Sequence, residues 1–231
     1  MRRKTTTTGK RPGFVRIAAA ALCLLGAGIP FDTASAVTRD KAIIIGSSGQ
    51  INTLDPLRSD YSQTNILNSA LYDTLIAFDE KNNMIGRLAE TFKVAEDGKS
   101  ITMKLRSGVK FHDGTALTAK DVAFTLDRLK KVGVGAALLI AGYDSTTVNG
   151  DLDLTINLSK PSAIFLSALC KIYIVNAALV TANAGDNDAQ TWLQAHDAGS
   201  GPYTVTSFEG QAVEMQRFDD YWEADPKRPE A

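Results

Sequence analysis

The sequence has 231 residues, of which 44% are hydrophobic and 22% are charged, and its 25 lysines and arginines are balanced by 26 aspartates and glutamates. This composition is typical of a globular protein that buries a core. The lack of a basic excess argues against a nucleic-acid-binding protein, because phosphates demand a basic face. Two cysteines are too few for a disulfide framework.

The first 36 residues have the outline of a secretory signal peptide. An uncharged apolar run covers residues 17–29 and is shorter than the roughly 20 residues that a membrane-spanning helix needs. The small residues Ala34, Ser35 and Ala36 predict cleavage after Ala36. Basic residues precede the apolar run: Arg2, Arg3, Lys4, Lys10, Arg11 and Arg16. We therefore expect export by the Sec route.

Removal of residues 1–36 leaves 19 basic and 25 acidic residues, so the expected mature chain is acidic. It retains Cys170 alone, which excludes an internal disulfide. A lipid anchor at Cys23 is disfavoured, because the bulky Leu22 precedes it. No later segment of the sequence is long and apolar enough to predict a membrane span.

The elements after the signal peptide begin with a strand, a loop and a helix. Ala42–Ser47 is a short apolar run that predicts a buried strand. From Ser62 to Leu75, apolar residues follow helical spacing. Alternating apolar residues on both sides of Asp97-Gly98 then predict a hairpin, because this dipeptide suits a tight turn.

The middle of the chain predicts a capped helix followed by a second hairpin. Thr118 lies three residues before Asp121 and predicts the helix start, and Gly133 predicts its end. Alternating residues around Asn149-Gly150 predict the second hairpin, which Pro161 ends.

The last part of the chain mixes short elements. Residues 164–169 are expected to be helical, 172–175 to be a strand, and 189–196 to be a short helix. A final hairpin is expected from Tyr203 to Phe218, turning at Glu209-Gly210. Helices and strands thus mix without internal repeats, which is typical of the α/β class.

Several strings resemble the family 5 extracellular solute-binding proteins, which include dipeptide-, oligopeptide- and nickel-binding components of ABC importers. The longest runs from Leu105 to Val122 and includes Phe111-His112-Asp113-Gly114. Further strings follow the family's order: Leu54-Asp55-Pro56, Leu71-Tyr72-Asp73-Thr74-Leu75, Leu88-Ala89-Glu90, Asp97-Gly98, Gly199-Ser200-Gly201-Pro202-Tyr203 and Tyr221-Trp222. They span nearly all of residues 42–222. Phe92 and Ser200 stand where the family usually has Trp and Thr, and both changes are conservative.

The resemblance implies an α/β fold of the periplasmic binding protein type II-like kind, with two lobes partly present and the C-terminal lobe missing. Residues 37–75 plus 183–231 are expected to form the incomplete lobe I, and residues 76–182 an inserted smaller domain. Residues 225–231 resemble a connection toward another element. We therefore expect the chain to be the N-terminal fragment of a longer protein.

The resemblance also implies a function without catalysis. A periplasmic substrate-binding protein of this kind captures di- or oligopeptides and delivers them to an ABC permease, whose ATPases power import. No cofactor is implied, and a monomer is expected. A nickel complex, haem, an opine or a sugar is an alternative ligand within the family. A secreted hydrolase is a more distant alternative.

The loop after the first strand is the expected ligand-binding site. It offers backbone polar groups and short hydroxyls at a strand end, where ligands often bind in open α/β sheets. By the resemblance, the stretch after Leu54-Asp55-Pro56 lies at the cleft and can pair with an extended ligand. The alternative is a plain surface connection. The candidate ligand-binding residues are Ser48, Gly49, Asp60, Tyr61 and Ser62.

Catalytic and metal-binding residues are not expected. His112-Asp113 has the residue types of a base with its orienting carboxylate, but it lies in a turn between a strand and a capped helix. His196 has no nearby cysteine or second histidine, as a zinc site would require. Gln50 replaces the last glycine of a nucleophile elbow. The aromatic pair Tyr221-Trp222 is expected to pack in the core.

Overall fold

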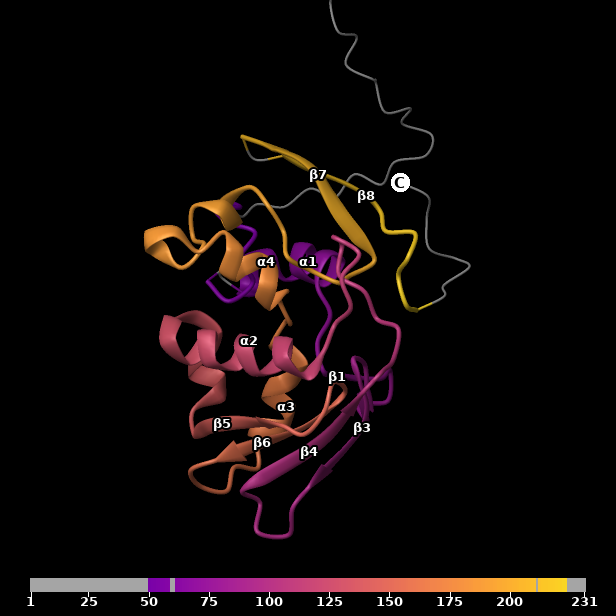
Figure 1. Ribbon diagram of the computed structural model, residues 1–231, viewed down its shortest axis with the longest axis vertical. Coiled ribbons are helices and arrows are strands. Elements are labelled where there is room, and N and C mark those ends of the chain that lie inside the picture. The colour runs from indigo at the N-terminus through magenta and orange to yellow at the C-terminus, as the bar shows by residue number, and fades with distance from the viewer. Residues whose placement is uncertain (1–49, 59–60, 211, 224–231) are drawn as a thin grey trace, which may run out of the picture. The chain divides into compact units, whose positions relative to one another are not determined.

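The computed structural model describes residues 50–58, 61–210 and 212–223, and Figure 1 shows how their helices and strands are arranged. The signal peptide expected at residues 1–36 and the strand expected at Ala42–Ser47 lie outside these residues. Two hydrophobic cores organise the described part of the chain.

The first core lies between a four-stranded antiparallel sheet and a long helix. The sheet has the order β3-β4-β6-β5. Its strands are β3 (Ala89–Val94), β4 (Ser100–Leu105), β5 (Tyr143–Val148) and β6 (Asp153–Leu158). Alternate residues of β4 and β6 point into the core and are buried: Ile101, Met103, Leu105, Leu154, Ile156 and Leu158. Both predicted hairpins are confirmed, because β3 pairs with β4 and β5 with β6.

Helix α2 (Ala119–Val132) packs against this sheet (Figure 1). At its start, the Asp121 carboxylate accepts hydrogen bonds from the Thr118 N–H (2.8 Å) and the Thr118 hydroxyl (2.9 Å). At its end, Gly133 adopts a left-handed conformation with φ of 68°. The apolar face toward the core is Val122, Leu126 and Leu129. The predicted helix is therefore confirmed at both ends.

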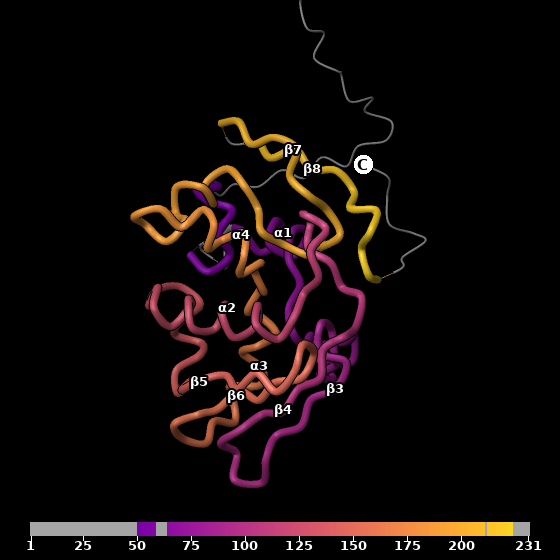
Figure 2. Tube along the Cα trace, in the orientation of Figure 1, coloured from indigo at the N-terminus to yellow at the C-terminus, as the bar shows by residue number. Residues whose placement is uncertain are grey.

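The second core is enclosed by α1 (Tyr61–Leu71), α4 (Ala177–Ala182) and the hairpin of β7 (Tyr203–Glu209) and β8 (Ala212–Arg217). Figure 2 shows the indigo, orange and yellow parts of the chain side by side here. Its buried residues are Leu54, Leu67, Leu71, Tyr72, Tyr173, Val175, Val180, Ala189, Leu193 and Ala198. The final hairpin is confirmed, with Gly210 at φ of 62° in its turn.

Short elements connect these parts. Strands β1 (Ile76–Phe78) and β2 (Met84–Gly86) form a small antiparallel pair. Helix α3 (Phe165–Ala168) lies within the stretch predicted to be helical. The described residues also contain four 3₁₀ helices: η1 (Gly135–Ile140), η2 (Leu169–Lys171), η3 (Gly185–Asn187) and η4 (Trp192–Gln194).

The prediction of where the first helix ends is wrong. Helix α1 stops at Leu71 instead of continuing to Leu75. Beyond that point the chain extends, and Thr74 forms a bridge with Tyr173. Leu71 is buried in the second core and Leu75 in the first, so their helical spacing reflects two separate burial sites.

One further local prediction is wrong, and another is confirmed only in part. Residues 172–175 contribute one isolated bridge, at Tyr173, and no strand. Within residues 189–196 the only helical turn is η4. The preceding Asp188 and Ala189 both have φ of 59°, a left-handed conformation that cannot begin a right-handed helix.

Candidate functional site

The loop before α1 is held by its own short polar side chains. The Asp55 carboxylate accepts a hydrogen bond from the Leu57 N–H at 3.0 Å, and Thr53 Oγ1 accepts one from the Asp55 N–H at 3.0 Å. The Leu54 N–H donates to the Leu193 carbonyl at 2.8 Å. Such aspartate and threonine turns fix the direction of the backbone. The chain therefore enters the predicted ligand-binding segment from a defined position.

Arg128 of α2 connects the loop around Asp55 to this helix. Its Nη1 and Nη2 donate to the two Asp55 carboxylate oxygens at 3.0 and 2.7 Å, which is a bidentate pair. The two side chains are 2% and 0% exposed. Burial by itself lowers the pKa of Arg128, but the hydrogen bonds and charge of Asp55 outweigh it and raise that pKa. Arg128 thus keeps its charge, and its bidentate contact with Asp55 fixes α2 against the loop.

Three of the five predicted ligand-binding residues, Ser48, Gly49 and Asp60, lie outside the described residues. Tyr61 and Ser62 begin the first turn of α1, directly after the loop that Asp55 holds. The ligand-binding role of all five stays a prediction.

A polar hollow of about 420 Å³ opens beside this loop. Arg58 Nη2 lies 3.6 Å and Lys131 Nζ 3.7 Å from the carboxylate of Asp188 at its wall. Charges of both signs surround this space, so it suits a polar solute better than an apolar one. The residues that line it are Arg58, Lys131, Ala184, Gly185, Asp186, Asn187, Asp188 and Gln190.

His112 has a structural position, as the sequence indicates. Its Nδ1 pairs with Asp197 rather than with the adjacent Asp113, and its Nε2 lies 3.0 Å from the Gly201 carbonyl oxygen. Asp113 instead accepts a hydrogen bond from Asn176 Nδ2 at 2.9 Å. Burial raises the pKa of Asp197, but the hydrogen bond and charge of His112 outweigh this effect and lower it. Both ring nitrogens of His112 are therefore occupied by protein groups.

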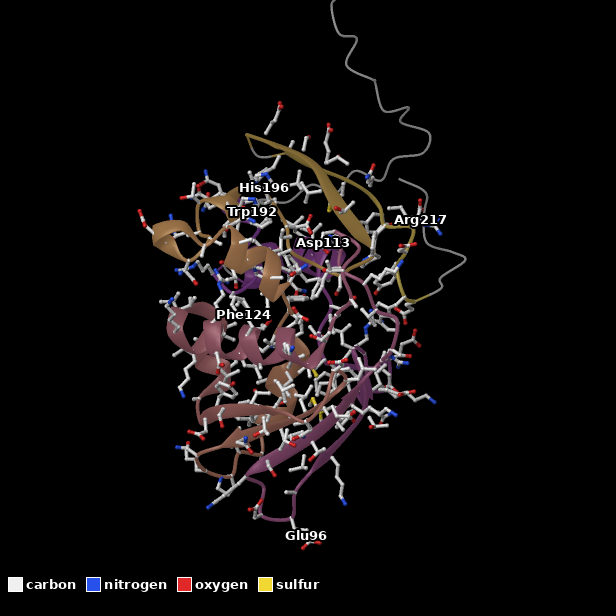
Figure 3. The ribbon with its side chains drawn as sticks, viewed as in Figure 1. Glu96, Asp113, Phe124, Trp192, His196 and Arg217 are labelled. Atoms are coloured by element: carbon white, nitrogen blue, oxygen red, sulfur yellow. The ribbon has the colours of Figure 1, made fainter. Side chains whose placement is uncertain are left out.

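His196 stacks on Trp192, with ring centroids 4.8 Å apart and planes 8° apart, and Figure 3 shows the two side chains together. Its Nδ1 lies 2.9 Å from the Trp192 carbonyl oxygen. Across residues 50–58, 61–210 and 212–223, no group of three or more His, Cys, Asp or Glu side chains could hold a metal ion. Within the same stretches, no helix combines the length and apolar character needed to cross a membrane.

Tyr221 and Trp222 are half-buried, and only Trp222 packs against the first core, so the prediction that this pair packs in the core is confirmed in part. Both residues also contact a buried carboxylate that the sequence did not indicate. Asp73 accepts hydrogen bonds from the Tyr221 hydroxyl, Trp222 Nε1 and Arg87 Nη2, each at 3.0 Å. The guanidinium carbons of Arg87 and Arg106 lie 5.0 and 5.1 Å from the centre of the Trp222 ring. This cluster anchors the end of the described chain to the β1–β2 region.

The glycines of Gly199-Ser200-Gly201-Pro202 permit close packing on the end of α1. The Gly201 N–H donates to the Leu71 carbonyl at 3.0 Å. A Cβ atom at Gly199 would lie 1.8 Å from that same oxygen, where no side chain fits. The segment therefore serves packing rather than ligand stacking.

Comparison with known proteins gives a family match. A model of bacterial extracellular solute-binding proteins, family 5 Middle, matches residues 83–231. The glutathione-binding protein GsiB of Pectobacterium atrosepticum is 30% identical over 194 residues, covering 80% of this chain and 36% of the relative. The probable D,D-dipeptide-binding periplasmic protein DdpA of Escherichia coli K12 is 31% identical over 192 residues, covering 78% of this chain and 36% of the relative.

Among solved structures, the binding protein AgaA in complex with agropinic acid, from A. tumefacien R10, is 27% identical with a TM-score of 0.67. The match covers 76% of this chain and 35% of AgaA. This likeness supports the mixed α/β architecture of periplasmic binding proteins over about a third of their length. The chain likewise spans about a third of the length of the curated relatives it matches.

Proposed function

This chain belongs to the bacterial extracellular solute-binding proteins of family 5, and on that premise we propose that it captures small peptides for an ABC importer. The family match across residues 83–231 carries the proposal. The relatives named for glutathione and for D,D-dipeptides support a peptide-like ligand. Capture involves no covalent step: the ligand is bound, carried and released unchanged.

The proposed binding surface consists of Ser48 and Gly49, before the loop that Asp55 holds, and of Asp60, Tyr61 and Ser62, after it. These residues would pair with the backbone of an extended ligand as an added strand does. A loop held by the buried pair of Asp55 and Arg128 supports this role, because a preorganised site loses less entropy on binding.

In the proposed architecture, residues 37–75 plus 183–231 belong to one lobe and residues 76–182 to an inserted smaller domain. Two separate hydrophobic cores support a division of this kind, although Tyr173, Val175 and Val180 of the inserted range pack in the second core, with residues of the first lobe. A hinge motion would close the protein over its ligand. The closed monomer would then dock on the permease, and the associated ATPases would power import. The outline of a signal peptide in residues 1–36 supports a periplasmic location.

A non-peptide acid is the second candidate ligand, and the match to AgaA in complex with agropinic acid favours it. The hollow walled by Arg58, Lys131 and Asp188 offers charges of both signs, which suits either ligand class.

Isothermal titration calorimetry tests the proposal by measuring the binding of glutathione, L-Ala-L-Ala, D-Ala-D-Ala and agropinic acid to the purified protein. We expect saturable binding of at least one peptide. Mass spectrometry of the recovered peptide should show an unchanged mass. Binding of agropinic acid alone would move the assignment to the opine class, and chemical conversion of any probe would refute the transport role.

A further inference from the structure

Arg128 contacts two loops that are distant from each other in the sequence. Besides its bidentate pair with Asp55, its Nε lies 3.0 Å from the Asp188 carboxylate and its Nη2 donates to the Asp188 carbonyl at 2.9 Å. Asp55 lies in the loop that leads into the predicted ligand-binding segment. Asp188 lies in the loop that lines the polar hollow. One guanidinium therefore fixes both loops relative to α2.

The Asp188 loop needs this support, because its backbone is strained. Asp188 and Ala189 are consecutive non-glycine residues with φ of 59°, in the left-handed region that L-residues avoid. Such residues persist only where surrounding contacts determine their conformation, and they cluster at functional sites. Arg128 contacts both the side chain and the carbonyl of Asp188, and Arg58 and Lys131 add longer ion pairs to the same carboxylate. Ala189 is fully buried.

We propose that Arg128 is a positioning residue for ligand capture: it sets the distance between the loop at residues 53–58 and the loop at residues 184–190. The inference rests on the proposed function and deepens it. The residue itself does not reach solvent, so it acts through Asp55 and Asp188 rather than by touching the ligand.

A purely stabilising role makes a different prediction. A buried ion pair can be replaced by uncharged groups with little loss of stability, whereas removal of one partner leaves a buried charge and is costly. Asn at position 55 would keep an oxygen for the Leu57 N–H, which Asp55 now binds at 3.0 Å. In Arg128→Met the Asp55 carboxylate is left buried without Arg128. The double variant Asp55→Asn/Arg128→Met removes that charge as well, but it still lacks the contacts between Arg128 and Asp188.

The test compares wild type, Arg128→Met and the double variant by thermal unfolding, hydrogen exchange and glutathione titration. Lys130→Met is the matched control, because Lys130 lies on the same helix but donates to the Asp144 carbonyl at 3.0 Å. We expect faster exchange, on the order of tenfold, at residues 53–58 and 184–190 in both Arg128 variants, with β4 unchanged. The double variant should regain most of the lost thermal stability while its glutathione affinity stays reduced.

The two proposals can fail separately. If the double variant regains both slow exchange in the two loops and wild-type glutathione affinity, Arg128 serves only to neutralise Asp55 and the inference is wrong. If glutathione does not bind wild type, that ligand assignment fails, while the exchange rates still decide whether Arg128 positions the loops. Equal exchange in wild type and Arg128→Met would overturn the inference directly.

Discussion

Replacing Asp73 by alanine should be among the most destabilising single changes in the described chain. The Asp73 carboxylate is buried and accepts hydrogen bonds from Arg87, Tyr221 and Trp222. Its removal takes this acceptor from the Tyr221 hydroxyl and from Trp222 Nε1, whereas Arg87 keeps its contact with Glu223 at 2.6 Å. Breaking a buried charge pair costs about 3–5 kcal/mol. Burial raises the pKa of Asp73, so part of its interaction energy only offsets desolvation. We therefore expect the lower end of that range, about 3 kcal/mol.

Thermal unfolding followed by circular dichroism measures this loss. For a domain of this size, about 3 kcal/mol lowers Tm by roughly 6–12 °C. Asp220→Ala is the control, since Asp220 pairs with Lys110 at 2.7 Å on the surface, where the side chains are 58% and 46% exposed. Such pairs are worth below about 1 kcal/mol. Asp73→Asn should fall between the two variants, because it keeps one acceptor. A Tm for Asp73→Ala equal to that of Asp220→Ala would refute the reasoning.

Three other outcomes follow from the packing and the charges. Gly199→Ala should destabilise the protein by several kcal/mol or prevent folding, because its Cβ would lie 1.8 Å from the Leu71 carbonyl oxygen. Gly150→Ala is the control: the nearest neighbour of its Cβ lies at 3.7 Å, so it should fold normally in a thermal unfolding assay. Because the pKa of Asp197 is lowered, its carboxylate stabilises the folded protein above pH 3.8, the ordinary pKa of aspartate, and this contribution is lost as the pH falls below that value. Urea titrations at several pH values should show the loss in wild type, and the unfolding free energy of Asp197→Asn should depend less on pH. Burial raises the pKa of the Cys170 thiol, so a thiol reagent at neutral pH should modify the folded protein more slowly than the unfolded protein, and equal rates would contradict the burial.

The parts of the fold that the sequence predicts well are those whose determinants are close together in the chain. Helix α2 carries its cap at Thr118, its apolar spacing and its terminal Gly133 within one segment. The turns at Asp97-Gly98 and Asn149-Gly150 likewise fix their hairpins locally.

The parts that the sequence does not predict depend on residues far apart in the chain. Leu75 has helical spacing but is buried in the other core, so α1 ends early. The left-handed turn at Asp188 and Ala189 is held by Arg128, 60 residues earlier. No local pattern reveals such a partner.

The candidate site follows the same rule. The position of the candidate site, after Leu54-Asp55-Pro56, is inferred from family resemblance. No residue type in that segment indicates a ligand-binding site by itself. The buried role of Arg128 was missed, although one signal was present: Asp121, Thr125 and Arg128 form a polar stripe on the buried side of a helix. Polar residues at helical spacing on a buried face indicate partners elsewhere in the fold. Asp73, the one charged residue of the string Leu71-Tyr72-Asp73-Thr74-Leu75, is a signal of the same kind.

The most direct test of the whole account is where a bound peptide protects the backbone. Hydrogen exchange should be measured on the purified protein with and without saturating glutathione or whichever dipeptide of the panel binds most tightly. We predict slower exchange concentrated at residues 58–66, with β3–β6 unaffected. Protection confined to the β3–β6 sheet, with residues 58–66 unchanged, would contradict capture at the segment that follows the loop held by Asp55.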